Sequence, residues 1–157
     1  MSPEFQMLKD SWYACKQRQE KLKYSLKKNQ SCFPLNISSL LLITNEQEES
    51  IDAFILRYSQ CVTMIQEQIF KGIAYLEQED ISDKSNRDKA LLMEKLGAIR
   101  SAEDFGTAAL LRNKFAHYYP EVTQSRIDRL NLLPVEASFV LDAFGEIEKY
   151  LLRKKFV

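Results

Sequence analysis

The chain has 157 residues, of which 45% are hydrophobic and 28% charged, and it holds 4 glycines and 4 prolines. This balance is typical of a single helical globular domain and excludes a disordered chain. Because Lys plus Arg and Asp plus Glu both number 22, the formal net charge is zero, which excludes a uniformly basic nucleic-acid coat. Any contact with RNA must therefore be local or be built by association of several copies.

The three cysteines, Cys15, Cys32 and Cys61, are widely spaced and form no CxxC pair. We expect reduced thiols of a cytoplasmic protein, without a disulfide framework, a metal site or another cofactor. The N-terminus shows no signal-peptide pattern and no apolar run reaches membrane length, so we expect no membrane association. A catalytic pair of Cys61 with the single histidine, His117, stays open, although only helical periodicity surrounds Cys61.

In the first half of the chain, residues 4–29 are rich in Lys, Gln, Glu and Leu and predict a helix. The segment 31–36 breaks it, because the residue before a proline avoids helical angles. Residues 37–43 form a short apolar piece, either a turn of helix or an extended segment. Asn45 suits an N-cap, and apolar residues at three- and four-residue steps predict a long helix over 46–78.

Two serines mark the helices that follow. Ser85 can cap a helix over residues 86–99, and Ser101, followed by two acids, can cap another that runs to about residue 118. Pro120 then ends the pattern.

The last part of the chain predicts a helical piece over 122–133, after which Pro134 suits the first turn of a separate final helix over 135–155. The fold class is therefore all-α. We expect an antiparallel bundle of about five helices in one domain, residues 1–157.

The stretch 112–120, Arg-Asn-Lys-Phe-Ala-His-Tyr-Tyr-Pro, holds the single histidine of the chain. A histidine can move a proton near neutral pH, and an arginine can hold a phosphate through two parallel hydrogen bonds. On one helix, however, five residues turn the directions of Arg112 and His117 apart by about 140°. The two can meet on one phosphate only if the helix end is distorted or if two copies of the motif face each other in a two-fold dimer.

These residue types suit metal-free cleavage of RNA, in which the ribose 2′-hydroxyl attacks the adjacent phosphorus. His117 would transfer the proton, and Arg112 would stabilise charge on the phosphate oxygens. Asn113 can orient the phosphate or the imidazole, and Tyr119 can contact RNA by a hydrogen bond or by stacking. DNA lacks the 2′-hydroxyl and is excluded as a substrate.

The same residues have simpler explanations. A histidine at a helix end is commonly a cap or a surface group, and Arg112 can be an ordinary ion-pair partner. Arg57 and Asp52 are weaker candidates for the site, since a surface ion pair and a helix-start acid account for them.

The pattern Arg112-Asn113-x-x-x-His117-x-Tyr119 resembles the Arg-x4-His-x-Tyr signature of HEPN domains, specifically of HepT-type toxins, where Asn often follows the arginine. The stretch 52–58, Asp-Ala-Phe-Ile-Leu-Arg-Tyr, also resembles the opening of that family's second helix.

The resemblance covers about residues 5–155 and implies a bundle of four or five helices that forms a two-fold homodimer with its active cleft at the interface. Residues 1 to about 35 would include a variable helical extension. The resemblance further implies a metal-independent endoribonuclease acting on tRNA or mRNA, with Arg112 and His117 as the catalytic pair and Asn113 in support.

HepT-type toxins are encoded with an MNT-type nucleotidyltransferase antitoxin, MntA, in type VII toxin–antitoxin pairs. The resemblance implies that this partner transfers AMP from ATP to Tyr119, and the added phosphate would then repel RNA from the site. Two alternatives stay open. One is a non-catalytic HEPN-like module that docks on a nucleotidyltransferase and helps to bind its substrate, and the other is a plain helical interaction protein.

Overall fold

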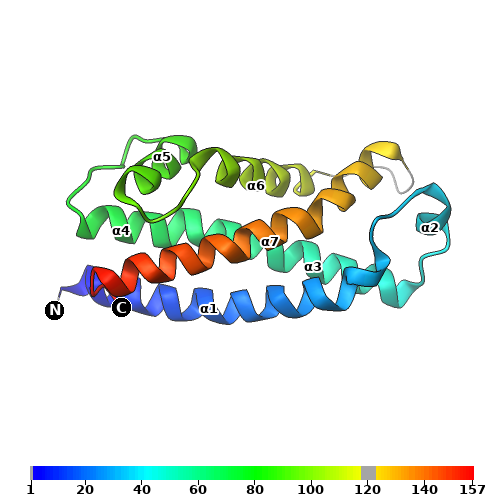
Figure 1. Cartoon of the computed structure of the whole chain (residues 1–157), viewed down its shortest axis with the longest axis horizontal. Coiled ribbons are helices and arrows are strands. Elements are labelled where there is room, and N and C mark those ends of the chain that lie inside the picture. The colour runs from blue at the N-terminus through cyan, green and yellow to red at the C-terminus, as the bar shows by residue number, and fades with distance from the viewer. Residues whose placement is uncertain (1, 118–122) are drawn as a thin grey trace.

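The computed structural model describes residues 2–117 and 123–157, and every regular element in this part of the chain is helical (Figure 1). The longer helices lie along one direction in an elongated bundle, in which α1 (Pro3–Asn29) and α7 (Gln124–Arg153) run antiparallel to each other, whereas the shorter α5 (Asn86–Leu96) is seen nearly end-on (Figure 1). The all-α fold predicted from the sequence is confirmed. The predictions for Tyr119 and Pro120 fall outside the described residues.

The first helix, α1 (Pro3–Asn29), matches the helix predicted over residues 4–29. It is a full member of the bundle, because Leu8, Trp12 and Leu22 are buried in the main core. Burial of such side chains is the principal source of stability.

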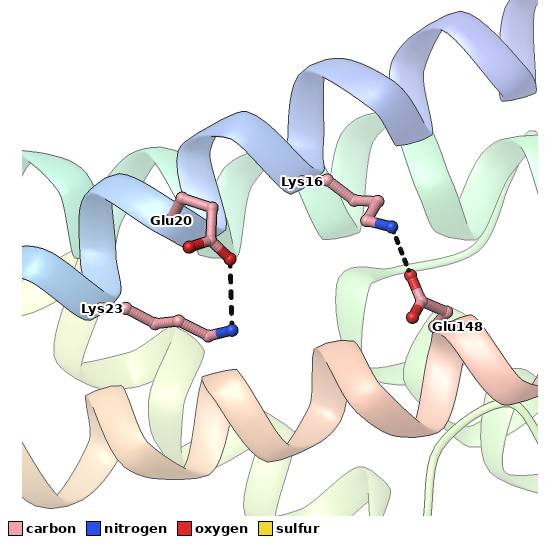
Figure 2. A network of polar contacts seen from close by, with 4 residues as sticks. All are labelled: Lys16, Glu20, Lys23 and Glu148. Atoms are coloured by element: carbon pink, nitrogen blue, oxygen red, sulfur yellow. Dashed lines mark hydrogen bonds and ion pairs between the residues drawn. The ribbon is translucent and has the colours of Figure 1, made fainter.

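Polar contacts on the surface of α1 add to this packing. Lys16 reaches Glu148 on α7 at 2.9 Å, and Lys23 pairs with Glu20 one turn earlier on α1 (Figure 2). All four side chains are at least 38% exposed, so these pairs contribute little stability, and only the Lys16–Glu148 pair links α1 to α7.

The short apolar piece at residues 37–43 is a helix, α2 (Ile37–Leu41), and not an extended segment. Asn36 and Ser39 form a reciprocal capping box at its start. The preceding connector is tied to α7, because the side-chain amide of Asn131 accepts from the N–H of Leu35 at 2.7 Å and donates to its carbonyl at 2.9 Å.

The long helix predicted over residues 46–78 consists of three consecutive pieces: α3 (Asn45–Met64), a π-helical turn (Ile65–Ile69) and α4 (Phe70–Leu76). The predicted N-cap is wrong by one residue, since Asn45 is the first helical residue and Thr44 is the cap. The Thr44 hydroxyl accepts the N–H of Gln47 at 3.1 Å, and the Gln47 side chain accepts the N–H of Thr44 at 2.9 Å. This reciprocal pair satisfies two backbone donors, which a cap at Asn45 would leave open.

The two predicted serine caps are confirmed. Ser85 caps α5 (Asn86–Leu96), and Ser101 caps α6 (Ala102–Phe115). The helix predicted to reach residue 99 ends at residue 96 because Gly97 adopts a φ of 88°, the left-handed conformation that terminates helices. The helix predicted to reach residue 118 ends at Phe115.

The predicted division of the last part of the chain at Pro134 is wrong. One helix, α7 (Gln124–Arg153), runs through this residue, and Thr123 is its N-cap. A proline inside a helix costs one backbone hydrogen bond. The helix nevertheless continues because its apolar stripe is buried on both sides of the proline, at Leu130, Leu133, Ala137 and Val140.

Among the described helices, none combines the length and the apolar character that a membrane crossing requires.

Candidate functional site

The candidate site begins where the last turns of α6 pass α3. Arg112 is half-buried there, and its Nη1 donates to the Thr63 hydroxyl on α3 at 2.6 Å. Its Nε is buried without an acceptor among the described residues. An unpaired buried donor costs free energy, so the Arg112 guanidinium would gain stability by donating a hydrogen bond to an anionic group.

A buried tyrosine on α3 helps to hold α6 in place against α3. The Tyr58 hydroxyl on α3 donates to the Ala108 carbonyl on α6 at 2.6 Å, and Phe115 packs against its ring edge-on at a centroid distance of 6.4 Å. Burial raises the pKa of Tyr58 far above its usual value, the charge of Glu136 on α7 raises it further, and the Arg112 charge opposes them. Tyr58 therefore stays neutral and fixes α6 against α3.

His117 lies just beyond the end of α6, with its backbone N–H donating to the Lys114 carbonyl at 3.3 Å. His117, Asn113 and Lys114 are all exposed. No hydrogen bond or ion pair from any described residue holds the imidazole of His117 or the amide of Asn113. Both groups are therefore available to a ligand.

Leu110 lies on the same side of α6 as Asn113 and Lys114, because these positions are three and four residues apart, and His117 follows just beyond the helix end. Its side chain is 55% exposed. The exposed face of α6 therefore combines one large apolar side chain with an amide, an amine and an imidazole.

No hydrogen bond or ion pair among the described residues links Arg112 to His117. Arg112 is directed to Thr63 at the junction of α6 and α3, while His117 projects from the exposed helix end. Tyr119, the remaining member of the motif, lies outside the described residues.

The two weaker candidates lie elsewhere on α3. Arg57 is directed toward α1, where its Nη1 donates to the Ser25 hydroxyl at 2.9 Å and its guanidinium lies over the Tyr24 ring at 5.9 Å. In a single copy, Arg57 thus links α1 to α3, apart from Arg112. Asp52 is exposed in the first half of α3.

The alternative pair of Cys61 and His117 is not supported. The Cys61 side chain is completely buried, and burial raises the pKa of its thiol to about 12. A thiol that stays protonated in the core is inert as a nucleophile. All three cysteines are free, as predicted.

Within residues 2–117 and 123–157, no three His, Cys, Asp or Glu side chains are grouped as metal ligands would be. Thr63 and Tyr58, the groups that position Arg112 and α6, were not identified from the sequence. Thr63 is 49 residues from Arg112, and a threonine on a helix carries no local pattern that marks it as an anchor.

Comparisons of the chain with protein-family models, with curated proteins and with solved structures gave no significant match. The resemblance to HEPN domains therefore rests on the motif and on the stretch 52–58, and it stays a prediction.

Proposed function

We propose that this protein is a metal-independent endoribonuclease of the HEPN class, the toxin of a type VII-like pair, acting on tRNA or mRNA. The observation that carries the proposal is the state of Arg112, a guanidinium fixed by Thr63 with a buried donor left unpaired. Arg112 lies five residues before His117, an exposed histidine whose imidazole makes no hydrogen bond or ion pair to a described residue.

The reaction would proceed by transesterification. The 2′-oxygen forms a bond to phosphorus and the bond from phosphorus to the 5′-oxygen breaks, which leaves a 2′,3′-cyclic phosphate. His117 transfers a proton to or from the reacting oxygens, and Arg112 stabilises the charge on the non-bridging oxygens. Asn113 orients the phosphate or the imidazole, and Tyr119 contacts the RNA.

The site would be completed by a second copy of the chain. In one copy no hydrogen bond or ion pair among the described residues links Arg112 to His117, and a two-fold dimer that pairs the α6 faces would bring the residues of both copies into one cleft. The 55% exposed Leu110 beside Asn113 supports association at this face, because an apolar side chain gains from burial at an interface.

Arg112→Ala and His117→Ala are the variants that test the activity, with Arg57→Ala as a matched control. Arg57 and Arg112 are both half-buried arginines that donate to one hydroxyl, so their loss should perturb folding similarly. Incubation with total tRNA in EDTA, followed by mapping of the fragment ends, should show cyclic phosphates with wild type and Arg57→Ala only. Unchanged cleavage by folded His117→Ala would refute the proposal.

Neutralisation would come from a cognate MNT-type nucleotidyltransferase that adds AMP to Tyr119. Mass spectrometry after incubation with that enzyme and ATP should show the addition at Tyr119 and none in a Tyr119→Phe variant. If wild type is modified but never cleaves RNA in its unmodified form, the protein is instead the non-catalytic module that docks on the nucleotidyltransferase.

A further inference from the structure

A second polar site lies at the other end of α6. A pocket of about 220 Å³ opens between the turn that joins α5 to α6 and the C-terminal part of α7. We call it the basic pocket and define it by Arg100, Glu146, Lys149, Tyr150 and Arg153. It lies at the N-terminal end of α6, whose 14 residues span about 20 Å, whereas His117 follows the C-terminal end.

The charges in the basic pocket do not balance. Arg100, Lys149 and Arg153 face one acid, Glu146. That carboxylate is already engaged by Arg100, since it accepts the Arg100 backbone N–H at 2.7 Å and lies 3.7 Å from the guanidinium. No described acidic side chain pairs with Lys149 or Arg153, so two positive charges remain available to an anion.

Arg153 is oriented, although it is exposed. Its guanidinium lies over the ring of Tyr150 at 5.4 Å, and that ring is buried and fixed by a hydrogen bond from its hydroxyl to Glu77 at 2.8 Å. Nη2 of Arg153 also lies close to Gly97, since a Cβ added to this glycine would be 3.7 Å from that nitrogen. A guanidinium placed in this way loses less freedom when it binds a ligand.

The helix dipole does not account for the whole cluster. The C-terminal end of a helix attracts cations, which explains basic residues after position 150 on α7. Lys154, one of these, is used internally in an ion pair with Glu77 at 3.0 Å. Lys149 lies before the last turn and Arg100 on a different segment, so the pocket gathers cations beyond those that the dipole favours.

We propose that the basic pocket binds a phosphate group. The guanidinium of Arg153 matches two phosphate oxygens with two parallel hydrogen bonds, and Lys149 and Arg100 add charge. The ring of Tyr150 is buried and covered by Arg153, so no aromatic face is left to stack a base. The ligand is therefore recognised by its phosphate, whether this belongs to a small molecule or to an RNA chain, and none of the residues of the proposed nuclease site takes part.

The test is calorimetric titration with inorganic pyrophosphate at fixed ionic strength. The double variant Lys149→Gln/Arg153→Gln should bind at least about tenfold more weakly than wild type, because hydrogen bonds to charged groups are lost. The matched control, Lys23→Gln/Lys27→Gln, removes the same charge from exposed positions of α1 and should bind like wild type. Equal weakening by both double variants would overturn the proposal.

Two further variants protect the test against a folding defect. Lys149 makes no hydrogen bond or ion pair to a described residue, so the Lys149→Gln variant should weaken binding without loss of helicity. Arg153→Lys keeps the charge but loses the two-pronged donor, so it should bind between wild type and Arg153→Gln.

A single-stranded oligoribonucleotide, tested in a His117→Ala background so that it stays uncleaved, and an acidic peptide of equal charge identify the source of the phosphate. If the double variant weakens binding of pyrophosphate and RNA alike, the pocket contacts nucleic acid, and if it affects pyrophosphate alone, the ligand is a small phosphate compound. If the peptide binds as tightly as pyrophosphate, the pocket attracts any anion and the proposal is wrong. Binding of neither phosphate probe would also overturn it.

Discussion

At the scale of single residues, the placement of Arg112 depends on one hydroxyl group. Replacing Thr63 with Val removes that hydroxyl while preserving the shape of the side chain, so the guanidinium loses its 2.6 Å contact. We expect cleavage to fall by about tenfold and stability to change by only about 1 kcal/mol. Initial rates on tRNA and urea unfolding measure the two effects.

Thr63→Ser is the matched control, because it keeps the hydroxyl and should retain most of the activity. Equal activity in Thr63→Val and wild type would show that this contact does not position Arg112 for the reaction.

Glu77 predicts an acid-sensitive contribution to stability. Burial raises the pKa of this carboxyl, but hydrogen bonds from Tyr150 and Lys154 and the Lys154 charge outweigh it, so the pKa is lowered from 4.5. The folded state therefore binds this proton less readily than the unfolded state. The stabilisation is complete above the unfolded value and is lost as the pH falls through the lower folded value.

Glu77→Gln should therefore be less stable than wild type by about 1 kcal/mol at neutral pH, and the difference should shrink in acid. Urea unfolding at neutral pH and at pH values below 4.5 measures this. Glu79→Gln, an exposed neighbour, should behave like wild type at both. A constant difference between Glu77→Gln and wild type across the pH range would contradict this assignment.

The sequence marks Arg112, Asn113 and His117 as candidates, because their residue types and spacing are a local pattern, and their role in a site stays a prediction. The sequence was not sufficient to find Thr63 or Tyr58. Their roles arise where α3 crosses α6, and contacts between residues 49 and 50 positions apart leave no local signal.

At the scale of helices, the packing of α1 against α4 depends on a glycine. A Cβ at Gly72 would lie 2.8 Å from Cδ1 and 3.3 Å from Cβ of the buried Leu8. Gly72→Ala should therefore destabilise the protein by about 1–3 kcal/mol, despite the higher helix propensity of alanine.

Gly145→Ala on α7 is the matched control. No atom lies within 4 Å of the added Cβ there, so this variant should gain about 0.5–1 kcal/mol from propensity alone. Urea unfolding compares the two, and a stabilised Gly72→Ala would show that Leu8 can move away.

Helix starts were easier to predict than helix continuity. The caps at Ser85 and Ser101 are predicted correctly because a serine directly before a run of helical periodicity is a local signal. Thr44 and Asn45 are adjacent and both can cap a helix, with asparagine the stronger cap, and the reciprocal bonds with Gln47 decide for Thr44. Pro134 was misread because the local cost of a proline is visible in the sequence, whereas the buried stripe that outweighs it depends on the tertiary fold.

At the scale of the whole molecule, the central question is whether two copies build one site. We expect light scattering to give a dimer. We also expect that mixing Arg112→Ala with His117→Ala, each inactive alone, restores activity. In an equal mixture, half of the dimers would contain one copy of each variant. One of the two sites in such a dimer would keep both Arg112 and His117, so the cleavage rate should recover to about one quarter of the wild-type rate.

This recovery requires that Arg112 and His117 in one site come from different copies. Absence of any recovery in a mixture that demonstrably exchanges subunits would show that each copy carries its own complete pair.

The unequal burial of the three thiols has a practical consequence for this question. Cys15 and Cys61 are completely buried, whereas Cys32 is only half-buried in the connector between α1 and α2. A nitroxide reagent should therefore attach selectively at Cys32, without any engineered mutation. Pulsed electron paramagnetic resonance would then return one interspin distance for a symmetric pair and no dipolar signal for an isolated chain. The native Cys32 thus allows the distance between two copies to be measured in the wild-type protein.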